Sequence, residues 1–133
     1  MMIPKFRAWL IGQEYMAEIE AIAFRGDGNV DVYTSLSGND FYTVGEECEL
    51  IQSTGLCDKN GVEIFEGDVV AYNGIRDFRL CIQRAFGGTY IAVNGKTTEL
   101  LKYINEGFVI IGNIYANPEL YHFPDAENMV THH

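Results

Sequence analysis

The chain has 133 residues, the length of one ordinary domain or of two very small ones that share a core. Nineteen Asp and Glu against nine Lys and Arg give it a formal net charge of -10. This excess disfavours non-specific binding to nucleic acids and to anionic membrane surfaces, which depends on clustered Lys and Arg. The charge can serve solubility alone, or it can present an acidic face to a basic partner.

No targeting or membrane-spanning segment is visible. The opening ten residues lack the apolar run of a signal peptide, because Lys5 and Arg7 interrupt them. Apolar runs such as residues 108–111 are far too short to span a bilayer. We therefore expect a cytoplasmic protein that does not interact with membranes.

The first half of the chain predicts a β-hairpin. Residues 19–25 and 30–35 flank Gly26-Asp27-Gly28-Asn29, whose residues favour the positive φ of a tight turn rather than a calcium loop. Residues 5–10 are expected to pair with this hairpin as an extra strand. Alternation along residues 30–35 puts Val30, Val32 and Thr34 on one face, and Asp31, Tyr33 and Ser35 on the other.

From residue 49 onward, β-prone runs recur every eight to twelve residues, which is typical of a small β-sandwich or barrel. A short helix is expected at residues 98–105, because Leu100, Leu101 and Ile104 fit one helical face. Asn117-Pro118-Glu119 predicts a brief helical turn. The expected strands are residues 50–53, 63–65, 68–72, 78–84, 90–93 and 108–111.

These elements predict a mainly β fold with minor α. We expect a small SH3-like or related β-barrel in residues 50–118, preceded by an N-terminal β-hairpin subdomain in residues 1–49 and followed by a tail in residues 119–133. Because no linker composition separates the two parts, a single folding unit is expected.

The segment of residues 54–72 carries the densest turn chemistry. Asp58-Lys59-Asn60-Gly61 is expected to close a hairpin between strands at Leu56 and Ile64. The corner Glu66-Gly67-Asp68 is interpreted as a turn whose carboxylate accepts backbone amide bonds, rather than as an acid–base pair. Beyond this corner, Val69 and Ala71 are expected to enter the barrel, with Val70 and Tyr72 on the other side.

No catalytic constellation is visible. The cysteines Cys48, Cys57 and Cys81 form no CxxC pair, and Cys48 and Cys81 are expected to pack as small hydrophobes. The three histidines lie in the C-terminal tail without further ligands at metal spacing. Neither a serine nucleophile elbow nor a glycine-rich phosphate loop is present. We therefore expect no enzyme activity, no cofactor and no metal.

One strand concentrates basic residues. Alternation is expected to turn Phe78, Leu80 and Ile82 inward and to leave Arg79 in solvent, which describes an ordinary strand with a solvated face. Alternatively, arginines interleaved with aromatic side chains could bind single-stranded nucleic acid. The residues of this alternative site are Arg76, Arg79, Arg84, Tyr72 and Tyr90.

Three blocks of the sequence resemble the YopX family of phage and prophage proteins. They are residues 5–9, residues 54–70, and residues 111–115 leading into residues 117–120, in the family order. The resemblance implies a phage or prophage origin, a cytoplasmic host setting and self-association, in a family without an assigned activity. It supplies no catalytic residues, and the sequence departs from the pattern at Cys57, where a polar or charged residue is more typical.

The function expected from these observations is binding. We expect a non-enzymatic accessory protein that forms homo-oligomers and binds host or phage proteins, because open sheet edges and abundant Tyr and Phe suit interfaces. The alternative is a small β-barrel that binds single-stranded nucleic acid, which the net charge disfavours.

Overall fold

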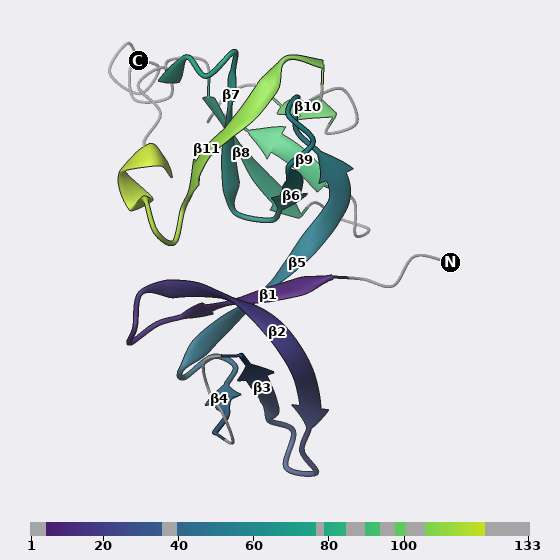
Figure 1. Cartoon of the computed structure of the whole chain (residues 1–133), viewed down its shortest axis with the longest axis vertical. Coiled ribbons are helices and arrows are strands. Elements are labelled where there is room, and N and C mark those ends of the chain that lie inside the picture. Colours follow the sequence, from purple (N-terminus) through teal and green to yellow (C-terminus); the bar gives the residue numbers. More distant parts are fainter. Residues whose placement is uncertain are drawn as a thin grey trace, which may run out of the picture. The chain divides into compact units, whose positions relative to one another are not determined.

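The computed structural model describes residues 5–35, 40–76, 79–84, 90–93, 98–100 and 106–121, with residues 90, 98–100 and 121 described by their backbone only. These residues form a six-stranded and a five-stranded sheet with antiparallel strand ladders, and one isolated parallel bridge joins Val44 and Cys48 (Figure 1). The predicted mainly β class is confirmed. The chain divides into two compact units, Met1–Ser53 and Thr54–His133. This division lies within a strand, whereas the sequence analysis placed it between residues 49 and 50.

The first unit is built around a hairpin with strands on both sides. β1 lies between β2 and β5, and β3 lies between β2 and β4. The predicted hairpin is β2 and β3, and the predicted extra strand is β1, so both predictions are confirmed. β1 pairs with residues 15–18 of β2 and β3 pairs with residues 19–24, with a bulge between Ile19 and Ala21 in the β2–β3 ladder. The strands are β1 (Phe6–Leu10), β2 (Tyr15–Phe24), β3 (Val30–Thr34), β4 (Tyr42–Thr43) and the start of β5 (Cys48–Cys57).

One face of these strands forms the core of the first unit. Val32 and Thr34 are buried and Val30 is half-buried, which matches the face predicted for β3. Asp31, predicted on the opposite face, is also buried, so β3 is covered on both sides. The buried core residues are Ala8, Leu10, Ala17, Val32 and Cys48, with Ile19, Tyr42, Val44 and Leu50 packed against them.

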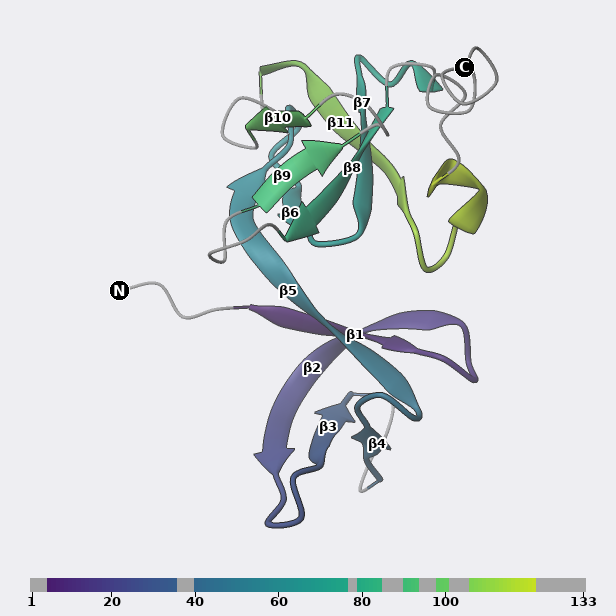
Figure 2. The same cartoon turned by 180° about the vertical axis from the view of Figure 1, so that it is seen from behind.

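The second unit contains a four-stranded meander and a returning strand. β7, β8 and β9 each pair with the strand that follows, and β11 returns to pair with β7 (Figure 2). The strands β6, β7 and β9 have the predicted bounds, and the predicted helical turn is the 3-10 helix η4. The elements are the end of β5, β6 (Glu63–Phe65), β7 (Asp68–Tyr72), β8 (Arg79–Arg84), β9 (Tyr90–Val93), β10 (Thr98–Leu100), β11 (Phe108–Asn113) and η4 (Pro118–Tyr121).

Both units therefore have one strand order. In each, four consecutive strands pair in sequence and a fifth returns beside the first, giving β4-β3-β2-β1-β5 and β10-β9-β8-β7-β11. A barrel-like part was expected only in residues 50–118, and the N-terminal part has more strands than the hairpin subdomain that we expected. The described strands do not close into a complete barrel in either unit.

The helix predicted at residues 98–105 is wrong where the structure describes it. Thr98, Glu99 and Leu100 form β10 and pair with Val93, Ala92 and Ile91 of β9, respectively. A short apolar run fits a helix and a strand equally well, and pairing with β9 supplies backbone partners that an isolated helical turn lacks. Residues 101–105 lie outside the described residues.

The core of the second unit corrects the predicted orientation of β7. Val70, rather than Val69 or Ala71, packs in the main apolar cluster, and all three side chains are fully buried. Alternation predicts sides correctly only when one face is solvated, and β7 is covered on both faces. The cluster consists of Ile64, Val70, Leu80, Ile82 and Ala92, with Phe108 and Ile110 packed against it.

The Asp58 carboxylate joins the β5–β6 turn to β11. Its Oδ1 accepts hydrogen bonds from the N–H groups of Asn60 and Val62 (2.9 Å each), which closes the predicted hairpin turn. Its Oδ2 accepts from the N–H of Ile110 (3.0 Å), and the N–H of Lys59 donates to the carbonyl of Phe108 (2.8 Å). The turn thereby supplies partners to the outer edge of β11.

The corner between β6 and β7 follows the prediction. Asp68 Oδ2 accepts a hydrogen bond from the N–H of Phe65 (2.8 Å), and Asp68 is buried. Gly67 has φ +87°, and a Cβ there would lie 2.7 Å from Cε2 of Tyr115. Only glycine fits this corner, because any side chain would meet both the positive φ and the ring.

We expect Asp58→Ala to lower the free energy of unfolding by about 3 kcal/mol or more, because hydrogen bonds to a charged acceptor contribute about 1.5–3 kcal/mol each. Asn60→Ala is the matched control in the same turn, since Asn60 contributes only its backbone N–H to Asp58 and should change stability by less than about 1 kcal/mol. Urea unfolding followed by circular dichroism measures both values. Equal stabilities of the two variants would contradict the role assigned to Asp58.

The thiols provide a second test. Cys48 and Cys81 are buried and Cys57 is exposed, and burial raises the pKa of the Cys48 thiol and of the Cys81 thiol to about 11. At about pH 8, close to the pKa of an ordinary thiol, iodoacetamide should therefore alkylate one site rapidly and two sites slowly. Cys57→Ser should remove the rapid phase. Two or more rapid sites would contradict the packing described for the cores.

The raised pKa values also make stability depend on pH in the alkaline range. In each case the pKa of the folded state exceeds the ordinary value of 9.0, so ionisation of the thiol favours the unfolded chain. We expect the free energy of unfolding to be unaffected by these thiols below about pH 9 and to fall as the pH rises from there towards 11. A Cys48→Ala/Cys81→Ala double variant should show a smaller alkaline decline in urea unfolding.

Candidate binding surfaces

The structure places Arg79 inside the second unit, so the prediction that it points into solvent is wrong. Only 9% of the residue is exposed, its Nε donates to the carbonyl of Leu120 (2.9 Å) and its Nη1 donates to the carbonyl of Arg76 (2.7 Å). Leu120 belongs to η4, so the guanidinium stabilises the end of that turn. The alternation rule failed here because β8 is covered on both faces, as the burial of Cys81 also shows.

The other residues of the predicted nucleic-acid site lie at two ends of β8. Arg84 pairs with Tyr90 in the β8–β9 ladder, and its Nη2 lies 3.2 Å from Oε2 of Glu66. Tyr72 is the last residue of β7. The residue before it, Ala71, pairs with Arg79 at the start of β8. A six-residue strand at ~3.3 Å per residue separates these ends by roughly 17 Å. The side chain of Tyr90 lies outside the described residues, and Arg76 is exposed.

An aromatic pair, the exposed Tyr72 and the half-buried Phe108, lies at the end of β7. The rings of Tyr72 and Phe108 meet edge to face, with centroids 5.5 Å apart. The Tyr72 ring also lies over Gly107, where a Cβ would be 2.6 Å from its Cε2. Tyr72 and Ile75 are each 48% exposed, and the N–H of Ile75 donates to the Tyr72 carbonyl (3.0 Å). We call Tyr72, Ile75 and Phe108 the Tyr72 patch.

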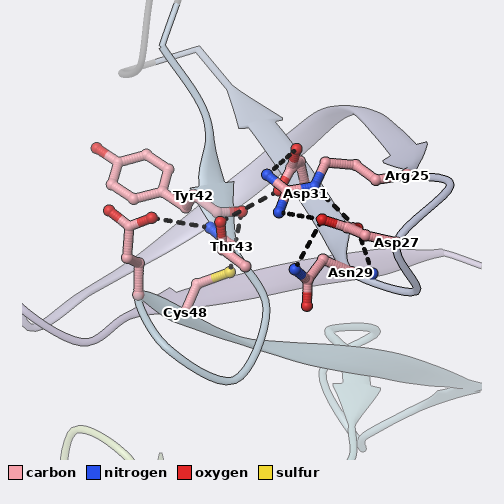
Figure 3. Close-up of polar contacts among 8 residues, drawn as sticks. Arg25, Asp27, Asn29, Asp31, Tyr42, Thr43 and Cys48 are labelled. Carbon is pink, nitrogen blue, oxygen red and sulfur yellow. Dashed lines mark hydrogen bonds and ion pairs between the residues drawn. The ribbon is translucent and has the colours of Figure 1, made fainter.

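In the first unit, polar side chains hold the β2–β3 turn (Figure 3). Arg25 Nη2 lies 2.9 Å from Asp27 Oδ2 and Nη1 lies 3.5 Å from Asp31 Oδ2, while Asp31 Oδ1 accepts from the Thr43 hydroxyl (3.2 Å). These contacts explain how Asp31 is buried on the face that sequence alternation left to solvent. The hydrogen bond from Arg25 lowers the pKa of the Asp27 carboxyl and raises the pKa of Arg25. This network stabilises a turn, and its only cation is already paired.

The first unit has a strongly acidic surface. Residues 1–53 contain nine Asp and Glu against three Lys and Arg, and all of these acids except Asp31 are exposed. Residues 54–133 contain ten acids and six bases, so the excess is smaller there. Exposed apolar side chains lie within the acidic surface, and Phe24 is the most exposed of them at 82%.

A metal-binding cluster is absent from the described residues. No group of three or more His, Cys, Asp or Glu that could hold a metal lies among them, and the histidines fall outside the described ranges.

No helix within the described ranges has the length and apolar character to cross a membrane.

Comparison with known proteins places the chain in a family. The family model described as YopX protein matches residues 5–122. The crystal structure of protein EF1440 from Enterococcus faecalis is similar with a TM-score of 0.60 and 30% sequence identity, covering 92% of this chain and 100% of that chain. The crystal structure of protein yopX from Bacillus subtilis shares the fold with a TM-score of 0.56 at 15% identity, covering 89% of this chain and 95% of that chain. No curated protein matches. Because the family model covers most of its length, the chain belongs to the YopX family.

Proposed function

We propose that this protein is a non-enzymatic accessory protein of a phage or prophage, which acts in the host cytoplasm by binding proteins and associates with itself through the Tyr72 patch. The supporting observation is the pair of side chains, Tyr72 and Ile75, that are each 48% exposed beside the half-buried ring of Phe108. Large apolar side chains that remain exposed next to one another mark interaction surfaces in soluble proteins.

The Tyr72 ring is held in place before any partner arrives. Phe108 contacts its edge, and Gly107 provides the space beneath it. A rigid aromatic side chain loses little conformational entropy on binding, and aromatic residues are enriched at interface cores. The Tyr72 patch therefore has the character of an interface anchor.

Charge also favours this patch over surfaces in the first unit. Two copies of an acidic chain repel each other, and the second unit has the smaller acidic excess. Two cations lie next to the patch: Lys59, whose Nζ donates to Asn73 Oδ1 (3.2 Å), and the exposed Arg76. Self-association at this end of the second unit meets less repulsion than elsewhere.

The nucleic-acid alternative has less support. Arg79 is committed to the carbonyls of Leu120 and Arg76, and Arg84 has Glu66 beside it. The remaining candidates, Arg76 and Tyr72, lie within the Tyr72 patch and its border. A protein interface explains their exposure without requiring an acidic chain to bind a polyanion.

We expect sedimentation velocity at micromolar concentrations to show a homo-oligomer, and Tyr72→Ser with Ile75→Ser to weaken its association by about tenfold or more, because buried aromatic anchors dominate interface energies. Tyr15→Ser is the matched control, since Tyr15 is 50% exposed on the first unit. A wild-type monomer at all concentrations, or an equal loss with Tyr15→Ser, would overturn the self-association proposal.

A further inference from the structure

Part of β2 has an edge with no strand partner among the described residues of the first unit. β2 lies between β1 and β3, so these neighbours occupy opposite edges. β1 pairs only with the first half of β2, from Tyr15 to Glu18, while β3 pairs with the second half up to Phe24. No described strand pairs with residues 21–24 on the β1 side. We call this stretch the β2 edge.

The backbone groups of Ile22 and Phe24 point to this open side. The N–H of Arg25 donates to the carbonyl of Asn29 (2.9 Å), on the β3 side, and successive residues of a strand point to alternate edges. Val30 is the ladder partner of Phe24. Its carbonyl accepts a hydrogen bond from the N–H of Val44 (2.9 Å), so it points away from β2. Within the part of the chain that the structure describes, two N–H and two C=O groups of β2 therefore face a side without a strand partner.

The apolar face of β2 continues to this edge. Ile22 pairs with the core residue Val32, and Phe24, two residues further on, lies on the same face. Ile22 is half-buried, whereas 82% of Phe24 is exposed. A strand added at the edge would place alternate side chains over Phe24 and extend the core face.

The other face of β2, opposite Ile22 and Phe24, favours a positively charged segment at this edge. It carries the small side chains of Ala21 and Ala23 beside β3, and the exposed carboxylates of Glu18 and Glu20 precede them on the same strand. Long basic side chains can lay their apolar stems over alanines and reach carboxylates with their charged ends. The surrounding unit has nine acids and three bases, which attracts a basic segment.

We propose that the β2 edge binds an extended segment of a partner protein, in which basic and apolar residues alternate, as an added β-strand. Main-chain hydrogen bonds to Ile22 and Phe24 supply affinity, and the side chains of Phe24 and Glu20 supply specificity. The inference rests on the proposed protein-binding function and names the chemistry of the partner.

A second copy of this chain is a poorer occupant. Symmetric antiparallel pairing of two β2 edges centred on Ala23 would bring Glu20 of each copy towards the turn that carries Asp27 of the other. Like charges across a strand pair are unfavourable. Each copy would also bring the acidic excess of its first unit.

The test uses the full-length protein and a fluorescein-labelled eight-residue peptide of alternating Lys and Val, measured by fluorescence anisotropy. We expect binding that weakens with salt, and no binding of the matching Glu and Val peptide. The Lys and Val peptide with N-methyl groups on its two central residues should lose about tenfold or more in affinity, because one main-chain donor on each edge is removed.

Variants locate the site. Phe24→Ala should weaken peptide binding by about tenfold, and Glu18→Lys with Glu20→Lys by a similar factor at low salt. Phe24→Pro should abolish binding without breaking the β2–β3 ladder, because the N–H of Phe24 points away from β3. Tyr15→Ala is the control on the paired half of β2 and should bind normally. Protection of Cys48 from alkylation confirms that each variant is folded.

Equal binding of the acidic or the N-methylated peptide, or normal binding to Phe24→Ala, would overturn the proposal. Loss of self-association in Phe24→Pro would do so as well, since a second copy would then occupy the edge. The Tyr72→Ser/Ile75→Ser variant separates the two proposals. If it is monomeric and binds the peptide, both hold, and if the wild type oligomerises without binding the peptide, only the β2 edge proposal fails.

Discussion

The second unit depends on one buried carboxylate. Asp58 receives two N–H groups from its own turn and one from β11, a strand that begins fifty residues later in the sequence. One carboxylate therefore determines the shape of the β5–β6 hairpin through Oδ1 and the position of the last strand through Oδ2. The two segments lie far apart in the sequence, and each provides half of one hydrogen-bonded junction.

The two units use one strand order but treat their edges differently. In the second unit, the outer edge of β11 receives Lys59 and Asp58 from the hairpin turn. In the first unit, the second half of β2 has no equivalent cover among the described residues, and Phe24 is exposed beside it. Exposed edges are usually protected because they invite pairing. The edge of β11 is thus covered by the Asp58 turn, whereas the second half of β2 keeps an edge at which another strand can pair.

Sequence reasoning recovered what depends on local chemistry. Turn residues gave the β2–β3 hairpin, the Asp58 turn and the Asp68 corner, and β-prone runs gave most strands. It failed where both faces of a strand are covered, because alternation then no longer separates inside from outside. This is why Arg79 was expected in solvent and Val70 was assigned to the wrong side. The burial of Asp31 depends on Thr43, which is twelve residues away and reaches it only through the β3–β4 pairing.

The binding surfaces were harder to foresee for a related reason. Tyr72 was singled out from sequence, but its partners Phe108 and Gly107 lie more than thirty residues away. Phe24 gave no signal, since an apolar residue at the end of a predicted strand normally packs in a core. The structure shows that Phe24 lies beyond that core, because β3 pairs with β2 as far as Phe24 whereas β1 pairs with β2 only as far as Glu18.

The bulge at Glu20 has a consequence for how this sequence can change during evolution. By adding one residue to β2, it sets the phase in which Ile22 and Phe24, rather than Ala21 and Ala23, share the face of Val32. Deletion of Glu20 would only remove the bulge, because Ile19 and Ala21 already lie opposite the consecutive residues Thr34 and Tyr33. Deletion of a residue beyond the bulge would instead exchange the two faces of the strand that follows it. The bulge is therefore the one place where β2 can lose a residue without turning Phe24 to the other face.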